Sequence, residues 1–168
     1  MSTRLIVILS TLLLAASSAS AQSRDPFAAD FSANYDFVYH EPGATSNLGA
    51  HFDIASTVTR DVPYLVVLGE LGINHFDGGS VASFLGGARL RFPNASPTVL
   101  PYAQVLVGLY HCGVCNENDF ALQAGGGLDF KTGHAVRIRG QVDWRRIFAT
   151  VGVNGVRASI GVVLPLNQ

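Results

Sequence analysis

Charged residues are scarce in this 168-residue sequence. Only 14% of its residues are Asp, Glu, Lys or Arg, where an average soluble domain has roughly 25%. The 11 basic residues do not outnumber the 12 acidic ones, so there is no basic excess to neutralise a phosphate backbone. Lys131 is the single lysine, whereas soluble surfaces carry many. The composition therefore argues against a nucleic-acid-binding protein and against a barrel whose polar face meets water.

Long apolar runs are missing after the amino-terminal segment. The run at residues 5–16 is shorter than the roughly 20 residues that a membrane-spanning helix needs. It follows Arg4 and precedes small residues that end at Ala21, which is the order of a secretory signal peptide. We expect residues 1–21 to be the cleaved signal peptide and residues 22–168 to form one mature domain.

The mature region instead shows a period of two. Eight stretches place apolar residues at every second position, as in a β-strand. These stretches are residues 31–40, 48–57, 65–74, 83–92, 102–110, 120–130, 136–145 and 156–164. Turn-forming residues separate them, and no helical pattern lies between them. An even number of strands with hairpin-length connections predicts an all-β, antiparallel up-and-down sheet that closes into an eight-stranded barrel.

The charges indicate which face of the barrel points inward. The polar faces carry both signs of charge in near balance, which suits a closed interior where charges pair. We expect a lumen charge network of Glu70, Arg89, Arg91, Asp129, Arg137, Arg139, Asp143 and Arg145, with Asp36 or Asp53 as a further partner. No Asp, Glu, Lys or Arg falls on the apolar face of these stretches, as lipid requires. The fifth stretch is apolar on both faces. Because Gln104 is polar, we predict that the face that carries it points into the lumen. We therefore predict a transmembrane barrel.

Three segments carry a resemblance to a known family. They are residues 101–108, which begin with Pro-Tyr and end with Gly, the glycine-rich residues 123–129, and residues 137–145, where Arg, Gln and Asp occupy alternate positions. With these segments the chain resembles, over about residues 27–166, the small outer-membrane β-barrel domains of the OmpA-like and opacity-protein-like type. The resemblance implies a bacterial outer membrane, insertion by the barrel-assembly machinery and both termini in the periplasm. Connections after the first, third, fifth and seventh strands then face outward. The family usually ends on an aromatic residue, whereas this sequence ends at Gln168, so we expect less efficient insertion.

Two cysteines, Cys112 and Cys115, lie in the third outward connection. In an oxidising compartment this spacing predicts a local disulfide that holds a tight loop. Two other interpretations stay open. One is a metal site that adds His111 and either His75 or Asp119, and the other is a thioredoxin-like redox site, which requires a helix. We expect no cofactor and no metal.

The sequence predicts an integral outer-membrane protein with a structural or surface-recognition role, because eight strands leave a lumen that paired side chains fill. Its expected partners are outer-membrane lipids, the barrel-assembly machinery and an extracellular ligand of unknown kind. The alternatives are a soluble periplasmic barrel that binds a small apolar ligand and a narrow, porin-like channel of low conductance. We expect no enzymatic activity, since no histidine has a serine two residues away; the histidines are His40, His51, His75, His111 and His134.

Overall fold

The computed structural model describes residues 28–40, 43–58, 64–76, 78–92, 98–132, 136–150 and 152–165, so the predicted signal peptide, residues 1–21, lies outside it. The elements are eight strands. They are β1 (Ala28–His40), β2 (Gly43–Thr57), β3 (Leu65–Phe76), β4 (Gly79–Arg91), β5 (Val99–Cys112), β6 (Glu117–Lys131), β7 (Arg137–Ile147) and β8 (Val153–Pro165). Within these ranges no helix is long and apolar enough to cross a membrane.

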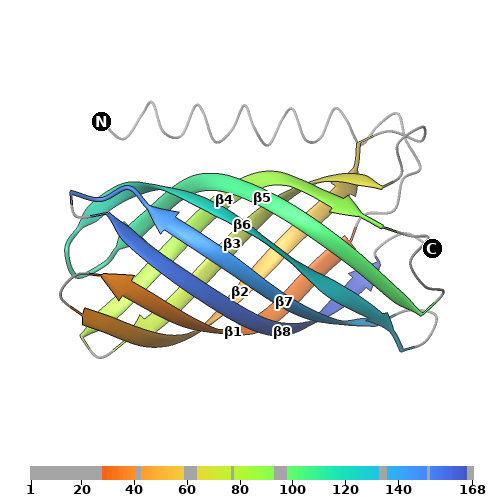
Figure 1. Cartoon of the computed structure of the whole chain (residues 1–168), viewed down its shortest axis with the longest axis horizontal. Coiled ribbons are helices and arrows are strands. Elements are labelled where there is room, and N and C mark those ends of the chain that lie inside the picture. Colours follow the sequence, from red (N-terminus) through yellow and green to blue (C-terminus); the bar gives the residue numbers. More distant parts are fainter. Residues whose placement is uncertain are drawn as a thin grey trace.

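The strands form one closed barrel in chain order. Each pairs antiparallel with the next, and β8 pairs with β1, so the sheet has no free edge. Figure 1 shows the strands tilted across the barrel axis, with the connections gathered at its two ends. The end with the β1–β2, β3–β4, β5–β6 and β7–β8 connections is called the outer end here, following the expected orientation, and the opposite end the inner end. The predicted fold class is confirmed.

The strands extend beyond the alternating stretches. β2 begins at Gly43, ahead of the alternation that starts at Leu48, because backbone pairing with β1 continues where side chains are no longer apolar. The outer-end connections are therefore short, at residues 41–42, 77–78, 113–116 and 148–152. In the β3–β4 connection Gly78 has a φ of 127°, a conformation that glycine adopts without steric cost.

The apolar face points outward on every strand. Phe31, Ile73 and Ile160 are 63%, 65% and 65% exposed, whereas Arg89 and Arg139 are 1% exposed inside the barrel. The ambiguous fifth stretch has the predicted phase, because Gln104 is buried and the neighbouring Val105 is exposed. The arrangement is the reverse of a soluble protein, with charge in the middle and hydrocarbon at the surface.

The lumen also contains an apolar cluster, which was not predicted from the sequence. Buried side chains from β2 to β7 form one cluster: Ala55, Val66, Leu68, Val81, Leu85, Leu106, Tyr110, Ala121 and Ile147. Val66 and Leu68 alternate with Val67, which is exposed, so both faces of β3 are apolar here. Where both faces are apolar, alternation no longer distinguishes lumen from lipid.

We predict that an arginine on the outer surface destabilises the barrel according to its depth. Ile160 lies midway along β8, and Leu48 pairs with His75 near the outer end. Ile160→Arg should lower the free energy of unfolding by about 2–4 kcal/mol and Leu48→Arg by about 0–1 kcal/mol, because the bilayer centre holds no water or headgroup. Urea titration of the barrel refolded in lipid vesicles measures both values. Equal losses at the two positions would contradict the membrane-facing assignment.

Candidate functional site

Arg139 organises the inner half of the lumen. Its guanidinium donates two hydrogen bonds to Asp129, at 2.7 and 3.0 Å. A third nitrogen donates to Asp30 at 2.8 Å and to Asp53 at 3.2 Å. Asp53 also accepts from Arg89 at 2.7 Å. These contacts join β7 to β1 and β2, strands that are not neighbours in the sheet, so the ion pairs reach across the interior.

Tyr102 lies between two of the arginines. Its ring centroid is 4.6 Å from the guanidinium carbon of Arg89 and 4.8 Å from that of Arg139, within the range of cation–π attraction. Its hydroxyl donates to Gln141 at 2.5 Å. Tyr102 pairs with Gly127, where an added Cβ would stand 2.6 Å from the tyrosine oxygen. Glycine is therefore required at this position for the ring to lie across β6.

Arg157 organises the outer half. It donates to Glu70 at 2.7 and 2.8 Å and to Asp143 at 2.7 and 3.0 Å. Arg145 pairs with Asp36 at 3.4 Å and lies 3.9 Å from a Glu70 oxygen. Glu70 accepts through both of its oxygens, which is among the strongest charge-assisted arrangements, and Asp143 accepts both of its bonds on one oxygen.

Glutamines join the two halves into one network. Gln104 accepts from Arg89 at 2.9 Å and donates to Asp143 at 3.1 Å. Gln141 donates to the same carboxylate at 2.6 Å. Because each ionised group has partners, the cost of burying these charges is offset, but removal of one partner leaves an uncompensated charge.

The expected network and the observed one overlap. The six expected residues that form ion pairs are Glu70, Arg89, Asp129, Arg139, Asp143 and Arg145, and Asp36 and Asp53 join them. The sequence analysis missed Asp30 and Arg157, although both lie on the inward face of their strands. The expected ion pairing of Arg91 and Arg137 is not seen within the described residues. Both lie at strand ends on the inner side, where the nearby carboxylate of Asp129 is already bonded to Arg139 through both oxygens.

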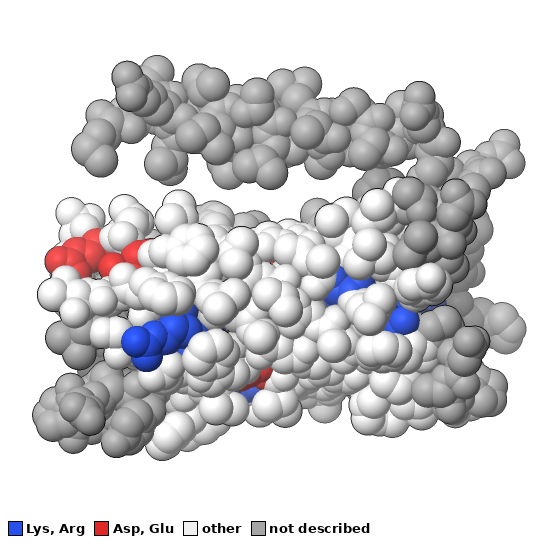
Figure 2. Space-filling view, turned by 45° about the horizontal axis from the view of Figure 1, so that its top comes forward, with Lys and Arg blue, Asp and Glu red and all other residues white. Residues whose placement is uncertain are grey.

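One arginine interrupts the apolar exterior, contrary to expectation. Arg146 follows Trp144 on the outward face of β7, beside Leu122 of β6 and Asn154 of β8. The sequence pattern did not predict this outward charge, because the seventh alternating stretch ends at Arg145, one residue before it. In Figure 2 the exterior is largely white, and the blue and red atoms lie mainly toward the two ends. An outward charge at the end of a strand is tolerated because it meets headgroups rather than acyl chains.

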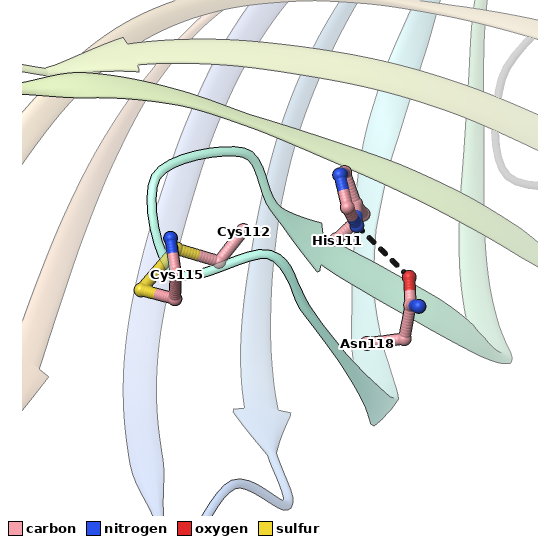
Figure 3. The surroundings of a disulfide bond; sticks show 4 residues. All are labelled: His111, Cys112, Cys115 and Asn118. Atoms are coloured by element: carbon pink, nitrogen blue, oxygen red, sulfur yellow. Dashed lines mark hydrogen bonds between the residues drawn. A yellow bond between two sulfur atoms is a disulfide. The ribbon is translucent and has the colours of Figure 1, made fainter.

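Two more polar pairs lie on the outward face at the same end. Across the β3–β4 hairpin the ring Nδ1 of His75 is 3.0 Å from the Ser80 oxygen. Across the β5–β6 hairpin the ring Nδ1 of His111 is 2.9 Å from the Asn118 amide oxygen (Figure 3). The polar belt consists of these two pairs with Arg146 and Asn154: His75, Ser80, His111, Asn118, Arg146 and Asn154. It gives the outer end a polar rim on the lipid side.

The predicted disulfide between Cys112 and Cys115 is present and closes the β5–β6 connection (Figure 3). The Cys115 amide donates to the Cys112 sulfur at 3.2 Å, and the Gly113 amide donates to the Ser80 carbonyl at 3.0 Å. Asn116 completes the turn with a left-handed φ of 52°, which asparagine tolerates better than most residues. Both sulfurs are thus used, and in the described part of the chain no group of three His, Cys, Asp or Glu side chains could hold a metal ion.

The His75–Ser80 contact joins the two residue types of an activated nucleophile. No serine lies two residues from a histidine in the sequence, but the hairpin register brings together His75 and Ser80, which are five residues apart. A hydrolytic site also needs a group that orients the histidine. Among the described residues no carboxylate hydrogen-bonds to His75, so no third member of such a site is seen there.

No protein-family model matches the chain, and no curated protein sequence matches it. Its structure is similar to Neisserial surface protein A, with a TM-score of 0.68 and 15% identity over 83% of this chain and 97% of that one. It is also similar to Ail, the attachment invasion locus protein of Yersinia pestis, solved with the heparin analogue sucrose octasulfate (TM-score 0.56, 11% identity, 83% and 97% coverage). A third similar structure is the outer membrane enzyme PagL (TM-score 0.52, 14% identity, 82% and 99% coverage).

These likenesses show that the chain has the fold of small eight-stranded outer-membrane barrels. At such low identity they show nothing finer. One of the three proteins is described as an enzyme, so the fold alone does not decide whether this chain catalyses a reaction.

We predict that the ion pairs of Arg157 contribute strongly to the free energy of unfolding of the barrel. Arg157→Ala leaves Glu70 and Asp143 without their bidentate partner and should lower the free energy of unfolding by about 3–5 kcal/mol. Arg146→Ala removes the same side chain from the exterior and should change it by no more than about 0.5 kcal/mol. Urea unfolding in vesicles compares the two variants. A loss at Arg157 as small as that at Arg146 would contradict the network as described.

Proposed function

We propose that this protein is an integral β-barrel of the bacterial outer membrane with a structural or surface-recognition role. Residues 1–21 direct its export, and residues 22–168 form the barrel. The observation that carries the proposal is the apolar exterior around a charged, ion-paired lumen. In water such an exterior would be an apolar patch far larger than the few hundred Å² that soluble monomers expose. In a bilayer the same side chains meet acyl tails.

The polar belt supports the proposed orientation. With both termini in the periplasm, the outer end reaches the outer leaflet, and the belt lies at the level of its headgroups. A guanidinium there costs about 0–1 kcal/mol, against roughly 2–4 kcal/mol at the bilayer midplane. Arg146 and the imidazoles of His75 and His111 then face phosphate and sugar groups rather than hydrocarbon. Outer-leaflet lipid is the partner that this arrangement favours.

The outer connections are suited to rigid recognition. They are short, and the disulfide holds the one at residues 113–116, where Val114 is 63% exposed. A preorganised loop loses little entropy on binding a partner. The chemistry of the ligand differs from the sulfated compound bound in the Ail structure, because the described part of this end carries the exposed Glu117, the half-buried Asp119 and a single cation, Arg146. A partner that is not strongly anionic fits it better.

Two alternatives find less support. A soluble barrel with an apolar ligand inside needs an open apolar lumen, whereas the small cavity found here is lined by Asp36, Tyr110, Arg145 and Arg157 among others. A channel needs a continuous path, whereas Arg139 and Arg157 bridge strands across the interior. The proposed role is therefore that of a plugged scaffold without conductance or catalysis.

We predict that the protein is recovered with the outer membrane and needs detergent for extraction. Unheated in SDS, the closed barrel should migrate differently from the boiled chain, because its backbone hydrogen bonds have no edge at which unfolding starts. Cell fractionation and paired gels measure this, with Ile160→Arg as the variant that should lose the heat-dependent shift first. A monomer that stays soluble in buffer without detergent would overturn the membrane assignment.

A further inference from the structure

Three cations on the lumen face at the inner ends of their strands have no ion pair among the described residues. Arg91 is the last residue of β4, Lys131 the last of β6 and Arg137 the first of β7. These three residues are called the inner-mouth cluster. The other arginines that face the lumen, such as Arg139 and Arg157, are all paired with carboxylates.

Lys131 and Arg137 stand directly opposite one another in the β6–β7 ladder. Both project to the lumen side, because Asp129 and Arg139, two residues deeper on the same strands, are buried inside. Like charges directly opposite across a sheet repel and destabilise the pairing. The register thus concentrates positive charge at the mouth, and nothing in the described residues relieves it.

Arg91 adds a second, independent observation. Its Nε is buried and has no hydrogen-bond acceptor in the part of the chain that the structure describes. A buried donor without a partner is costly, and native structures rarely keep one without a ligand or water. Arg91 lies within electrostatic reach of Arg137 and of Asp129, but both oxygens of that carboxylate are bonded to Arg139, at 2.7 and 3.0 Å. An acceptor for Arg91 has to come from outside the network.

We propose that the inner-mouth cluster binds a phosphate group from the periplasmic side. Two guanidinium groups and one ammonium supply the positive charge and the hydrogen-bond donors that phosphate oxygens accept. The phosphate can belong to an inner-leaflet phospholipid headgroup or to a soluble phosphate compound, since both present the same oxygens. The inference goes beyond the proposed function, because a scaffold that displays outer loops does not require a ligand at its periplasmic mouth.

The charge distribution of the two ends agrees with this assignment. The outer end carries Glu117 and Asp119 on the lumen side of β6, which repel an anion. The inner end carries cations on the same face of the same strand, at Lys131. A phosphate is thus directed to one mouth of the barrel and not to the other.

The test uses the protein purified from membranes into maltoside micelles, which contain no phosphate, and follows backbone amide resonances by NMR. One arm adds inorganic phosphate, and the other adds a short-chain phosphatidylglycerol to the micelles. We expect saturable shifts at the amides of Arg91, Lys131 and Arg137. Lys131→Gln or Arg137→Gln should weaken binding about tenfold or more, the usual effect of losing a charged hydrogen bond. Lys131 is exposed at a strand end, so its variant should fold normally even where Arg137→Gln does not.

Arg146→Gln is the matched control, because it removes one positive charge from the polar belt at the outer end and should leave unchanged the Kd that is read from the amides of the inner-mouth cluster. Saturation by the lipid alone identifies a headgroup site, and saturation by inorganic phosphate identifies a site for soluble compounds; either supports the proposal. Absence of saturable shifts in both arms overturns it, as does an equal loss in Arg146→Gln. A well-dispersed spectrum shows that the barrel is folded, so failure here leaves the membrane assignment intact.

Discussion

The structure depends on one constraint: a charged side chain within a bilayer needs a partner other than lipid. Strands present side chains to opposite faces in turn, so a barrel in acyl chains sends every second residue to hydrocarbon and the rest inward. Arg89, Arg139 and Arg157 are consequently enclosed, and six carboxylates, Asp30, Asp36, Asp53, Glu70, Asp129 and Asp143, are buried with them. The apolar exterior and the paired interior are two results of the same alternation.

The ion pairs also specify how the strands are placed. Slipping one strand by a single residue would move its apolar side chains into the lumen and its arginines into lipid, so register is strongly determined. Contacts such as Arg139 to Asp30 and Arg157 to Glu70 join strands far apart in the sequence and would be lost in a shifted barrel. The lumen also contains the apolar cluster around Leu68 and Leu106, whose packing does not depend on the pairing of charges.

Much of this fold could be predicted from the sequence because the two-residue period is a local property. This period was sufficient to predict the number of strands, the closure of the barrel and the inward face of each strand. On β5 the inward face was indicated by Gln104 alone. Features that depend on which residues of neighbouring strands are paired could not be predicted from the period. The pairing of Arg157 with Glu70 and the meeting of His75 with Ser80 follow from which residues stand opposite, which alternation does not encode. The start of β2 at Gly43 was not predicted, because the backbone pairing extends beyond the residues that alternate between apolar and polar.

Trp144, the single tryptophan, reports directly on the central claim that the apolar face meets lipid. It lies on the outward face of β7 and is 43% exposed. Its fluorescence in vesicles whose lipids carry bromine on the acyl chains should be strongly quenched, while aqueous acrylamide should have little effect. Quenching by acrylamide with no response to brominated lipid would contradict the account.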